Sequence, residues 1–392
     1  MLMKIAIVHS RYSSGAASGE NVVVRNHLTS LHNLGHEVEL FEYETPSSFN
    51  SIIFKLQSAI TVSFGISGAN PTRRIKQFGP DVIFLHNIFP NISERWLKSI
   101  DIPIVRFVHN FRTLCAIGTF YRDNSSCYDC LTISLWSSLK NKCYKNSFFA
   151  TLPVFFSIVR TKIGNRPLIN SPEMTLVLSK KAVTLVESHE RGVRNVKVLH
   201  NFVDELPPTE RLQPELGKRW VIISRLEPEK GIEELLNVLP MNIGLDIIGD
   251  GSLLPILKSK YRLSRDIRFL GKLNQSEIFE TLSSYTGAFF SSKWLEGAPM
   301  TLIEFLRAGI PTISITNNVE IPGLMPELTL TWGEVDLRNK LNSLVSQVQD
   351  HTQREILSNQ ATKAYLHSFN VTAWQTTLMK YLNSLDFNAA NT

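Results

Sequence analysis

The chain has 392 residues, of which 43% are hydrophobic and 19% are charged, so it can form two or three domains and extended disorder is excluded. No apolar run is long enough to span a bilayer, and the N-terminus is typical of a first strand rather than of a signal peptide, so we expect a cytoplasmic protein. The net charge of +6 is uneven, because residues 1–200 carry 23 Lys and Arg against 13 Asp and Glu, whereas residues 201–392 carry 18 against 22.

A basic first half can meet nucleic acid, an anionic membrane or a phosphorylated substrate, or it can simply be solvated. The sequence has neither a zinc-finger spacing with paired histidines nor an aromatic RNA-binding signature. Nucleic acid is therefore not an expected partner. The change in charge near the middle of the chain indicates two domains with different partners.

In the first half, short apolar runs alternate with polar loops and helical patterns. Residues 5–9 predict a strand that leads into a Ser- and Gly-rich loop, 10–19, and then into a helix that ends at Gly35. Further strands are predicted at residues 38–43, 82–85, 104–108, 175–178 and 196–199.

The second half restarts the same alternation. Strands are predicted at residues 220–223, 245–248, 288–290 and 312–315, and helices at 231–239 and 301–308. Strands that alternate with helices form parallel sheets, so we expect an α/β protein with two doubly wound, Rossmann-like domains facing across a cleft. A polar, Pro-containing stretch at 204–216 separates them, which predicts a first domain of residues 1–203 and a second of residues 204–368.

Two carboxylates, Glu296 and Glu304, lie around the start of a helix predicted near Pro299. They can converge if Glu296 lies in the loop before the helix and Glu304 lies inside it. The N-terminus of this helix offers free N–H groups to an anion. The alternative is a solvent-facing pair of glutamates around a capped helix.

Two cations, Arg225 and Lys230, follow the strand predicted at 220–223. At a turn between a strand and a helix they can hold a diphosphate, because Arg binds it bidentately and Lys acts as a mobile point charge. The alternative is a surface turn in which Glu227 and Glu229 balance both charges.

In combination, these residues resemble the retaining glycosyltransferases of family four, which have the GT-B fold. The resemblance runs from Lys4 to about Val319. In the second half it rests on residues 224–231, 248–251, 269–271 and 296–304, and in the first half on residues 14–21, 35–38, 80–83, 86–87, 108–115 and 200–204. At residues 316–320 the chain departs from the glycine pair of many relatives, which leaves that loop's contact to the donor sugar open.

The resemblance implies roles for the matching residues. Arg225 and Lys230 would hold the donor diphosphate and stabilise charge on the departing nucleotide. Glu304 would accept hydrogen bonds from the ribose, and Glu296 would stabilise the cationic transition state of the transferred sugar. His109 would contact that sugar from the opposite wall. Further donor-binding residues would be Gly15, Gly19, Gly249, Asp250, Gly251, Gly297, Pro299 and Ile303, and Asn201 would shape the cleft.

The family typically needs no catalytic metal, and its last helix usually crosses back to the first domain. Apolar residues at helical spacing, from Trp374 to Leu382, fit such a helix within residues 369–392.

All four cysteines fall in one stretch of the first half, in an expected insertion at about residues 112–146. Cys127 and Cys130 form a C-x-x-C pair, which is the usual half of a zinc site. We therefore expect a structural zinc ion held by Cys115, Cys127, Cys130 and Cys143. The alternative is four ordinary thiols.

Two apolar segments, residues 51–64 and 148–159, carry or adjoin basic residues. Both can be core helices. The excess positive charge of the same half favours contact with an anionic membrane surface, and with it a peripheral location on the inner face of the cytoplasmic membrane.

The expected function is transfer of a sugar from a nucleotide-diphosphate-sugar to a saccharide acceptor that is lipid-linked, with retention of configuration. The closest resemblance is to enzymes of bacterial surface-polysaccharide assembly, such as O-antigen, capsule or exopolysaccharide. A nucleotide-sugar epimerase, another GT-B enzyme such as a phosphorylase, and a non-catalytic nucleotide-sugar binder are the alternatives. The sequence leaves the sugar, the base and the acceptor open.

Overall fold

The structure is a computed structural model that describes residues 2–11, 19–45, 52–205, 219–241, 243–282 and 284–385. The chain forms two compact units. Unit 1 comprises Met1–Phe120, Cys127–His200 and Gln375–Thr392, and unit 2 comprises Tyr121–Ser126 and Asn201–Trp374. These divisions lie close to the boundaries expected at 203 and 368, and each unit is described by itself.

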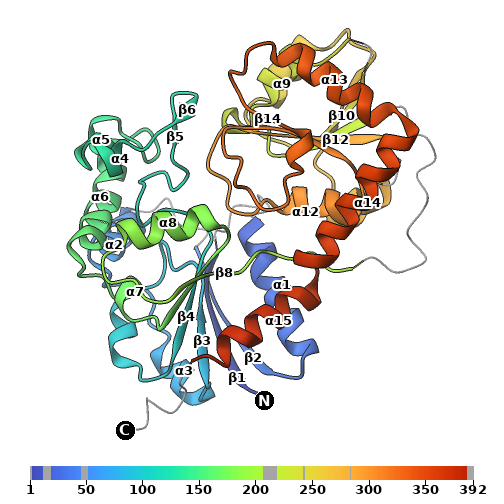
Figure 1. Cartoon of the computed structure of the whole chain (residues 1–392). Coiled ribbons are helices and arrows are strands. Elements are labelled where there is room, and N and C mark those ends of the chain that lie inside the picture. The colour runs from blue at the N-terminus through green and yellow to red at the C-terminus, as the bar shows by residue number, and fades with distance from the viewer. Residues whose placement is uncertain are drawn as a thin grey trace. The chain divides into compact units, whose positions relative to one another are not determined.

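Unit 1 is built on a sheet of six strands in the order β2-β1-β3-β4-β7-β8, all parallel (Figure 1). The central strands are buried from end to end, as expected of a parallel sheet with both faces covered. The strands are β1 (Lys4–Arg11), β2 (Glu37–Glu44), β3 (Val82–Leu85), β4 (Ile104–Val108), β7 (Met174–Val177) and β8 (Val196–Val198).

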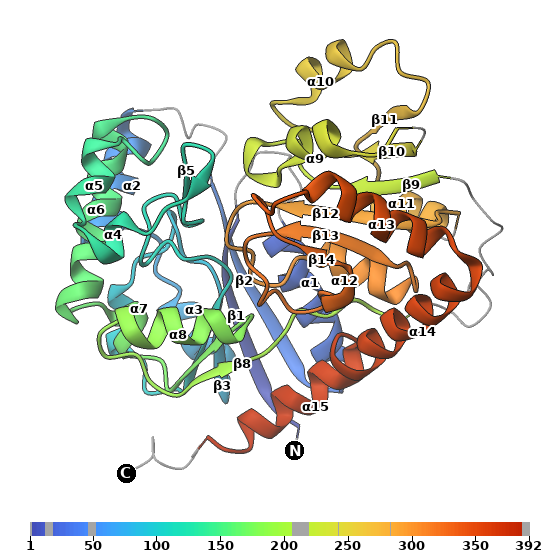
Figure 2. The same ribbon diagram turned by 45° about the horizontal axis from the view of Figure 1, so that its top comes forward.

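Helices surround this sheet. Serines begin two of them, because the Ser147 and Ser179 hydroxyls accept hydrogen bonds from backbone N–H groups of the first turn. The helices are α1 (Gly19–Asn33), α2 (Ile52–Phe64), α3 (Thr72–Phe78), η1 (Arg95–Ser99), α4 (Asp129–Thr132), α5 (Trp136–Lys140), α6 (Phe148–Ile163), α7 (Pro167–Asn170) and α8 (Lys180–His189). Helices α2, α4, α5 and α6 gather in one group, in which α2 and α5 pack against α6 (Figure 2).

Unit 2 has a second six-stranded parallel sheet, in the order β11-β10-β9-β12-β13-β14. The strands are β9 (Arg219–Ile223), β10 (Gly244–Ile248), β11 (Ile267–Gly271), β12 (Gly287–Ser292), β13 (Thr312–Thr316) and β14 (Thr329–Leu330). A short antiparallel hairpin, β5 (Tyr121–Arg122) and β6 (Ser125–Ser126), also belongs to this unit. The strands expected at the centre of both sheets are confirmed, whereas β11 and β14 were not expected.

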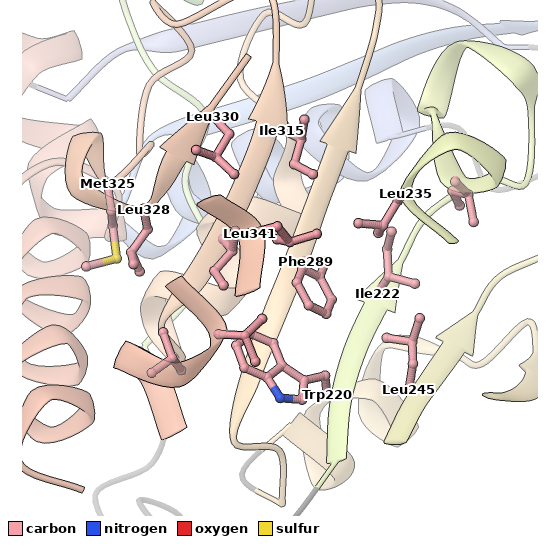
Figure 3. Close-up of a cluster of buried hydrophobic side chains, with 14 of the residues drawn as sticks. Trp220, Ile222, Leu235, Leu245, Phe289, Ile315, Met325, Leu328, Leu330 and Leu341 are labelled. Atoms are coloured by element: carbon pink, nitrogen blue, oxygen red, sulfur yellow. The ribbon is translucent and has the colours of Figure 1, made fainter. Parts of the chain in front are cut away.

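The core of unit 2 lies between its sheet and the covering helices (Figure 3). Trp220 on β9 is fully buried and stacks on Phe289 of β12, with ring centroids 4.6 Å apart. Gly287 on β12 is needed beside it, because a Cβ there would lie 2.6 Å from the Trp220 ring. The helices are η3 (Pro228–Lys230), α9 (Ile232–Val238), α10 (Leu254–Lys260), α11 (Gln275–Leu282), α12 (Met300–Arg307), η4 (Pro326–Leu328), α13 (Leu337–Gln349) and α14 (His351–Ser368).

The last helix, α15 (Val371–Leu382), begins in unit 2 and continues into unit 1. Within unit 1, the Gln375 side chain donates to Ser30 Oγ at 3.0 Å and the Tyr381 hydroxyl donates to the Val198 carbonyl at 3.0 Å. Leu378 and Leu382 are fully buried. The end of the chain therefore completes the unit in which the chain begins.

Candidate active site

A pocket in unit 2 lies at the switch point of its sheet, where β9 is flanked by β10 and β12. Ligands of doubly wound sheets bind at the carboxyl ends of the strands at such a point. The pocket has a volume of about 290 Å³, and its polar lining includes Ser224, Lys230, Ser291, Glu296 and Thr301. The sequence placed Lys230 and Glu296 in one site, and the structure brings them together.

Lys230 and Glu296 form a nearly buried ion pair. Lys230 Nζ donates to Glu296 Oε1 at 2.5 Å, and the Ser292 hydroxyl donates to the same oxygen at 3.1 Å. Lys230 can turn toward the sheet because Gly231 follows it with a φ of 65°, a left-handed conformation that suits glycine. An anion entering the pocket would compete with Glu296 for the ammonium group.

Arg225 lies near Lys230, over the same tryptophan ring. Its side chain is half exposed and pairs with Glu229 at 3.0 Å. The Arg225 and Lys230 cations lie over the Trp294 ring, 5.7 and 4.3 Å from its centroid. The aromatic ring thus holds two cations near each other, and Arg225 keeps enough exposure to reach a ligand.

Two asparagines outside the loop before α12 donate hydrogen bonds to the backbone of that loop. The Asn201 amide donates to the Ala298 carbonyl at 2.9 Å, and the Asn318 amide donates to the Glu296 carbonyl at 3.2 Å. Pro299 is in an extended conformation immediately before the helix and lines the pocket, and Gly297 lies in the same loop. Asn318 lies in the segment where the sequence departs from its relatives. The sequence alone did not reveal its support of Glu296.

Two further residues of α12 differ in their surroundings. Glu304 is buried, and this burial raises the pKa of its carboxyl to about 7, although nearby Arg307 lowers it. Glu304 is not part of the lining of the pocket that holds Glu296. Ile303 was expected to bind the donor, but its side chain is fully buried in the hydrophobic core. Ile303 is not part of the lining of the pocket that holds Glu296.

The Gly249–Gly251 turn packs against the backbone that carries Arg225. A Cβ on Gly249 would lie 1.8 Å from the Ser224 carbonyl oxygen, and one on Gly251 would lie 2.5 Å from the Leu226 carbonyl oxygen. Between them, the Asp250 carbonyl accepts a hydrogen bond from the Leu226 N–H at 2.9 Å. The two glycines are therefore required for close approach of two turns, and Asp250 is left exposed.

In unit 1, His109 follows β4 and forms a ring pair with His86, which follows β3. Their Nε2 and Nδ1 atoms are 2.8 Å apart, and the rings stack. Burial lowers the pKa of His109 to about 3 and that of His86 well below its usual value, so both imidazoles are neutral near pH 7. Two glycines of the first half were expected to bind the donor. Gly19 begins α1, and Gly15 lies outside the described residues.

The four cysteines lie near one another in unit 1. Burial and the neighbouring Cys115, Cys143 and Cys127 raise the pKa of Cys130 to about 12. Among the described residues, no group of three or more His, Cys, Asp or Glu side chains has the arrangement of a metal site. The structural zinc ion remains a prediction.

Comparisons with known proteins bear on the fold and on the class of the protein. Residues 210–322 match the model of the family described as glycosyl transferases group 1. No curated protein matches the chain in sequence. Among solved structures, Alr3699/HepE from Anabaena, in complex with UDP and glucose, is 15% identical with a TM-score of 0.60, over 98% of this chain and 100% of its own.

Two other solved structures are similar over nearly the whole chain. Sucrose-phosphate synthase (tll1590) from Thermosynechococcus elongatus is 14% identical with a TM-score of 0.68, over 97% of this chain and 98% of its own. The lipopolysaccharide outer core galactosyltransferase WaaB, in its apo form, is 16% identical with a TM-score of 0.59, over 98% of this chain and 100% of its own.

These likenesses define the fold, which is the α/β GT-B fold with two parallel-sheet domains. The family match covers the part of the chain that contains Arg225, Lys230, Glu296 and Glu304. The family match indicates an enzyme of the glycosyltransferase class.

Proposed function

We propose that the protein transfers a sugar from a nucleotide-diphosphate-sugar to a saccharide acceptor, with retention of configuration, as a family four glycosyltransferase. The observation that carries the proposal is the ion pair of Lys230 and Glu296 beside Arg225, at the switch point of a sheet in a glycosyl transferase domain. The solved relative Alr3699/HepE was crystallised with UDP and with UDP-glucose, which supports a nucleotide-sugar donor.

Each part of the unit 2 site has a role in this proposal. Arg225 and Lys230 bind the diphosphate, and when it leaves they stabilise its charge. Lys230 then exchanges a carboxylate partner for a phosphate partner, which releases Glu296 to face the sugar. Glu304 binds the ribose, and its burial raises the strength of a hydrogen bond made there. In unit 1, His109 lines a pocket of that unit as a neutral imidazole. The chemistry needs no catalytic metal, because the two cations supply the positive charge.

The test is incubation of the full chain with a panel of nucleotide sugars and methyl glycosides. Release of nucleoside diphosphate reports turnover, and NMR of the product reports the configuration of the new bond. We expect one donor to stabilise the protein against heat and to be turned over with retention. An inverted product contradicts the mechanism. An epimerised donor without released nucleotide favours an epimerase, and donor binding without any turnover favours a non-catalytic binder.

The setting we propose is bacterial surface-polysaccharide assembly, with a lipid-linked acceptor, on the inner face of the cytoplasmic membrane. No helix in the described ranges has the length and apolar content to cross a bilayer. A surface of unit 1 supports peripheral contact: Ile52, Ile53 and Leu56 on α2 and Phe149 on α6 are exposed by 61% or more. Only part of α6 is core, with Val154, Phe155 and Ile158 turned inward.

The charge around this surface is complementary to an anionic membrane. Exposed Lys55, Lys140, Lys142 and Lys145 lie on or between the same helices, and residues 133–166 contain no Asp or Glu. Exposed apolar side chains accompanied by exposed lysines can bind in the headgroup region of anionic lipids. A solvated patch of the same size would expose mostly polar side chains.

Vesicle pelleting tests the membrane contact. The protein should pellet with phosphatidylglycerol vesicles at low salt and be released at high salt, and it should stay in solution with phosphatidylcholine alone. The double variant Ile53→Ser, Phe149→Ser should lose pelleting. Ile256→Ser is a matched control, because Ile256 is an equally apolar, exposed residue of α10 in unit 2. Pelleting that ignores both lipid charge and the double variant contradicts the proposal.

We also propose that Cys115, Cys127, Cys130 and Cys143 hold a structural zinc ion. The support is their proximity, seen in the mutual effect on the pKa of Cys130, because zinc would bind the thiolates and remove that cost. Metal analysis of protein purified without chelator should give one zinc per chain. A zinc content near zero contradicts the site.

A further inference from the structure

Unit 1 has a pocket of its own at the carboxyl ends of β3 and β4. Its volume is about 540 Å³. Helix α1 follows β1, and its first turn carries Glu20 to this pocket. The polar lining includes Glu20, Asn87, His109, Asn110 and Arg112. Glu20 and Arg112 entered the sequence argument only as parts of longer motifs, without roles of their own.

The carboxylate of Glu20 is only partly satisfied. Asn110 forms a side-chain hydrogen bond with it. Its Oε1 is shielded from solvent and has no hydrogen-bond partner among the described residues. Burial raises the pKa of Glu20 to about 7, although Arg112 and Asn110 both lower it. Buried carboxylate oxygens normally accept a hydrogen bond. Oε1 accepts none among the described residues, which indicates a position for a donor group of a ligand.

Arg112 is held beside Glu20 by aromatic rings. Its guanidinium lies 4.5 Å from the Phe89 ring centroid and 5.4 Å from that of Tyr144. Its hydrogen bond to the Ala116 carbonyl is long, at 3.5 Å. The Arg112 backbone N–H donates to Asn110 Oδ1 at 3.1 Å, which orients the Asn110 amide. The three side chains thus form one preorganised group.

We propose that Glu20 and Arg112 form the recognition site for a hydroxyl pair of the acceptor saccharide. The open oxygen of Glu20 accepts a hydrogen bond from one hydroxyl, and the Arg112 guanidinium donates to the neighbouring oxygen. This rests on the proposed function and names the ligand of the unit 1 pocket.

The charges of Glu20 and Arg112 favour a neutral ligand over an ion, because the other two arginines of the lining, Arg106 and Arg166, already pair with Glu190 and Glu94. A phosphate or carboxylate ligand would be repelled by Glu20, and a cation would be repelled by Arg112. A vicinal diol offers a donor and an acceptor at adjacent positions, and this matches a carboxylate beside a guanidinium. A buried site made for such hydroxyls also rejects analogues that lack them.

Binding of methyl glycosides tests the proposal without turnover. Saturation-transfer NMR is recorded for the full chain with methyl α- and β-glycosides of glucose, galactose, mannose and N-acetylglucosamine. We expect at least one to bind the wild type. Glu20→Gln should weaken that binding about 10- to 100-fold, the effect of losing a hydrogen bond to a charged group. Arg112→Lys should weaken it less, because the charge remains and the planar fork is lost.

Glu187→Gln is the matched control, because Glu187 is an exposed glutamate of α8 in the same unit, outside the pocket. It should bind the glycoside as the wild type does. Glu20→Gln should melt no lower than the wild type, since the amide removes a buried charge, so a loss of binding will not reflect unfolding. The inference is overturned if no glycoside binds the wild type, or if Glu20→Gln binds equally well. UDP binding, measured in parallel, reports on the proposed function separately.

Discussion

The ion pair of Glu296 and Lys230 is expected to differ between the free protein and the donor-bound protein. Without a donor, each neutralises the other inside unit 2. In the proposed mechanism, a bound donor attracts the ammonium to its diphosphate and the carboxylate to its sugar. A buried pair of this kind contributes little net stability, because desolvation offsets the attraction. Its value lies in keeping two charged side chains in place until a substrate separates them.

Glu296→Gln should therefore reduce turnover much more than donor affinity. In the proposed mechanism, Glu296 stabilises positive charge that develops only in the transition state, and loss of one such group costs about 10²- to 10³-fold in rate. Steady-state kinetics with the best nucleotide sugar measures kcat and KM for the variant. Glu327→Gln, an exposed glutamate of η4, is the control. Wild-type turnover in Glu296→Gln would disprove the assigned role.

Arg225→Ala should behave differently, because the diphosphate is charged both when bound and when leaving. Donor affinity and turnover should fall together. Arg225→Lys should recover only part of the loss, since a lysine cannot replace a bidentate guanidinium over Trp294. The same kinetic assay separates the two effects. A variant that lowers kcat alone, with unchanged donor KM, is incompatible with ground-state binding by Arg225.

At the scale of elements, α15 contributes most through its apolar face. Leu378 is fully buried, whereas Lys380, two positions on, is exposed. Leu378→Ala should lower the free energy of unfolding by about 2–5 kcal/mol, the usual cost of a large cavity in a core. Lys380→Ala should change it by less than about 0.5 kcal/mol. Urea denaturation of both variants measures the difference, and equal stabilities would exclude a packing role for this helix.

A strand could be predicted from the sequence where its apolar residues form a clear run. Strands β3 and β4 are continuous apolar runs, and their predicted bounds agree with the structure. Strand β11 alternates between partly buried and exposed residues at a sheet edge, and β14 has only two residues, so neither gives a clear apolar run. Lys230 and Glu296 were predictable because their motif is local. Asn318 was not, because it lies where the sequence departs from its relatives, and Glu20 was not, because its partner Asn110 is distant in sequence.

At the scale of the whole molecule, a group of buried neutral histidines makes stability depend on pH. Burial lowers the pKa of His9, His27, His86 and His109 in the folded state. The unfolded chain binds these protons below about pH 6.5 and the folded chain does not, so stability falls as the pH drops below that value. Each histidine contributes about 1.4 kcal/mol per pH unit until its folded pKa is reached.

Two carboxylates have the opposite effect on the pH dependence of stability, but the four histidines outnumber them. Glu20 and Glu304, with folded pKa values of about 7 raised from 4.5, bind protons more readily when folded, which adds stability as the pH falls from about 7 toward 4.5. Urea denaturation at pH 7.5 and 5.5 should show lower stability at pH 5.5. His27→Leu should reduce the slope by about one proton. A wild type more stable at pH 5.5 would contradict the neutral cluster.

The division of the chain between the units has a consequence for synthesis on the ribosome. Unit 2 is complete once Trp374 has emerged, but unit 1 begins with β1 and ends with Leu378 and Leu382. The apolar surface that receives these leucines stays uncovered until Leu378 and Leu382 have been synthesised. Unit 2 can therefore reach its native state first, while the earlier part of the nascent chain still offers a chaperone-binding surface. A chain truncated before Leu378 would have its defect in the unit that is translated first.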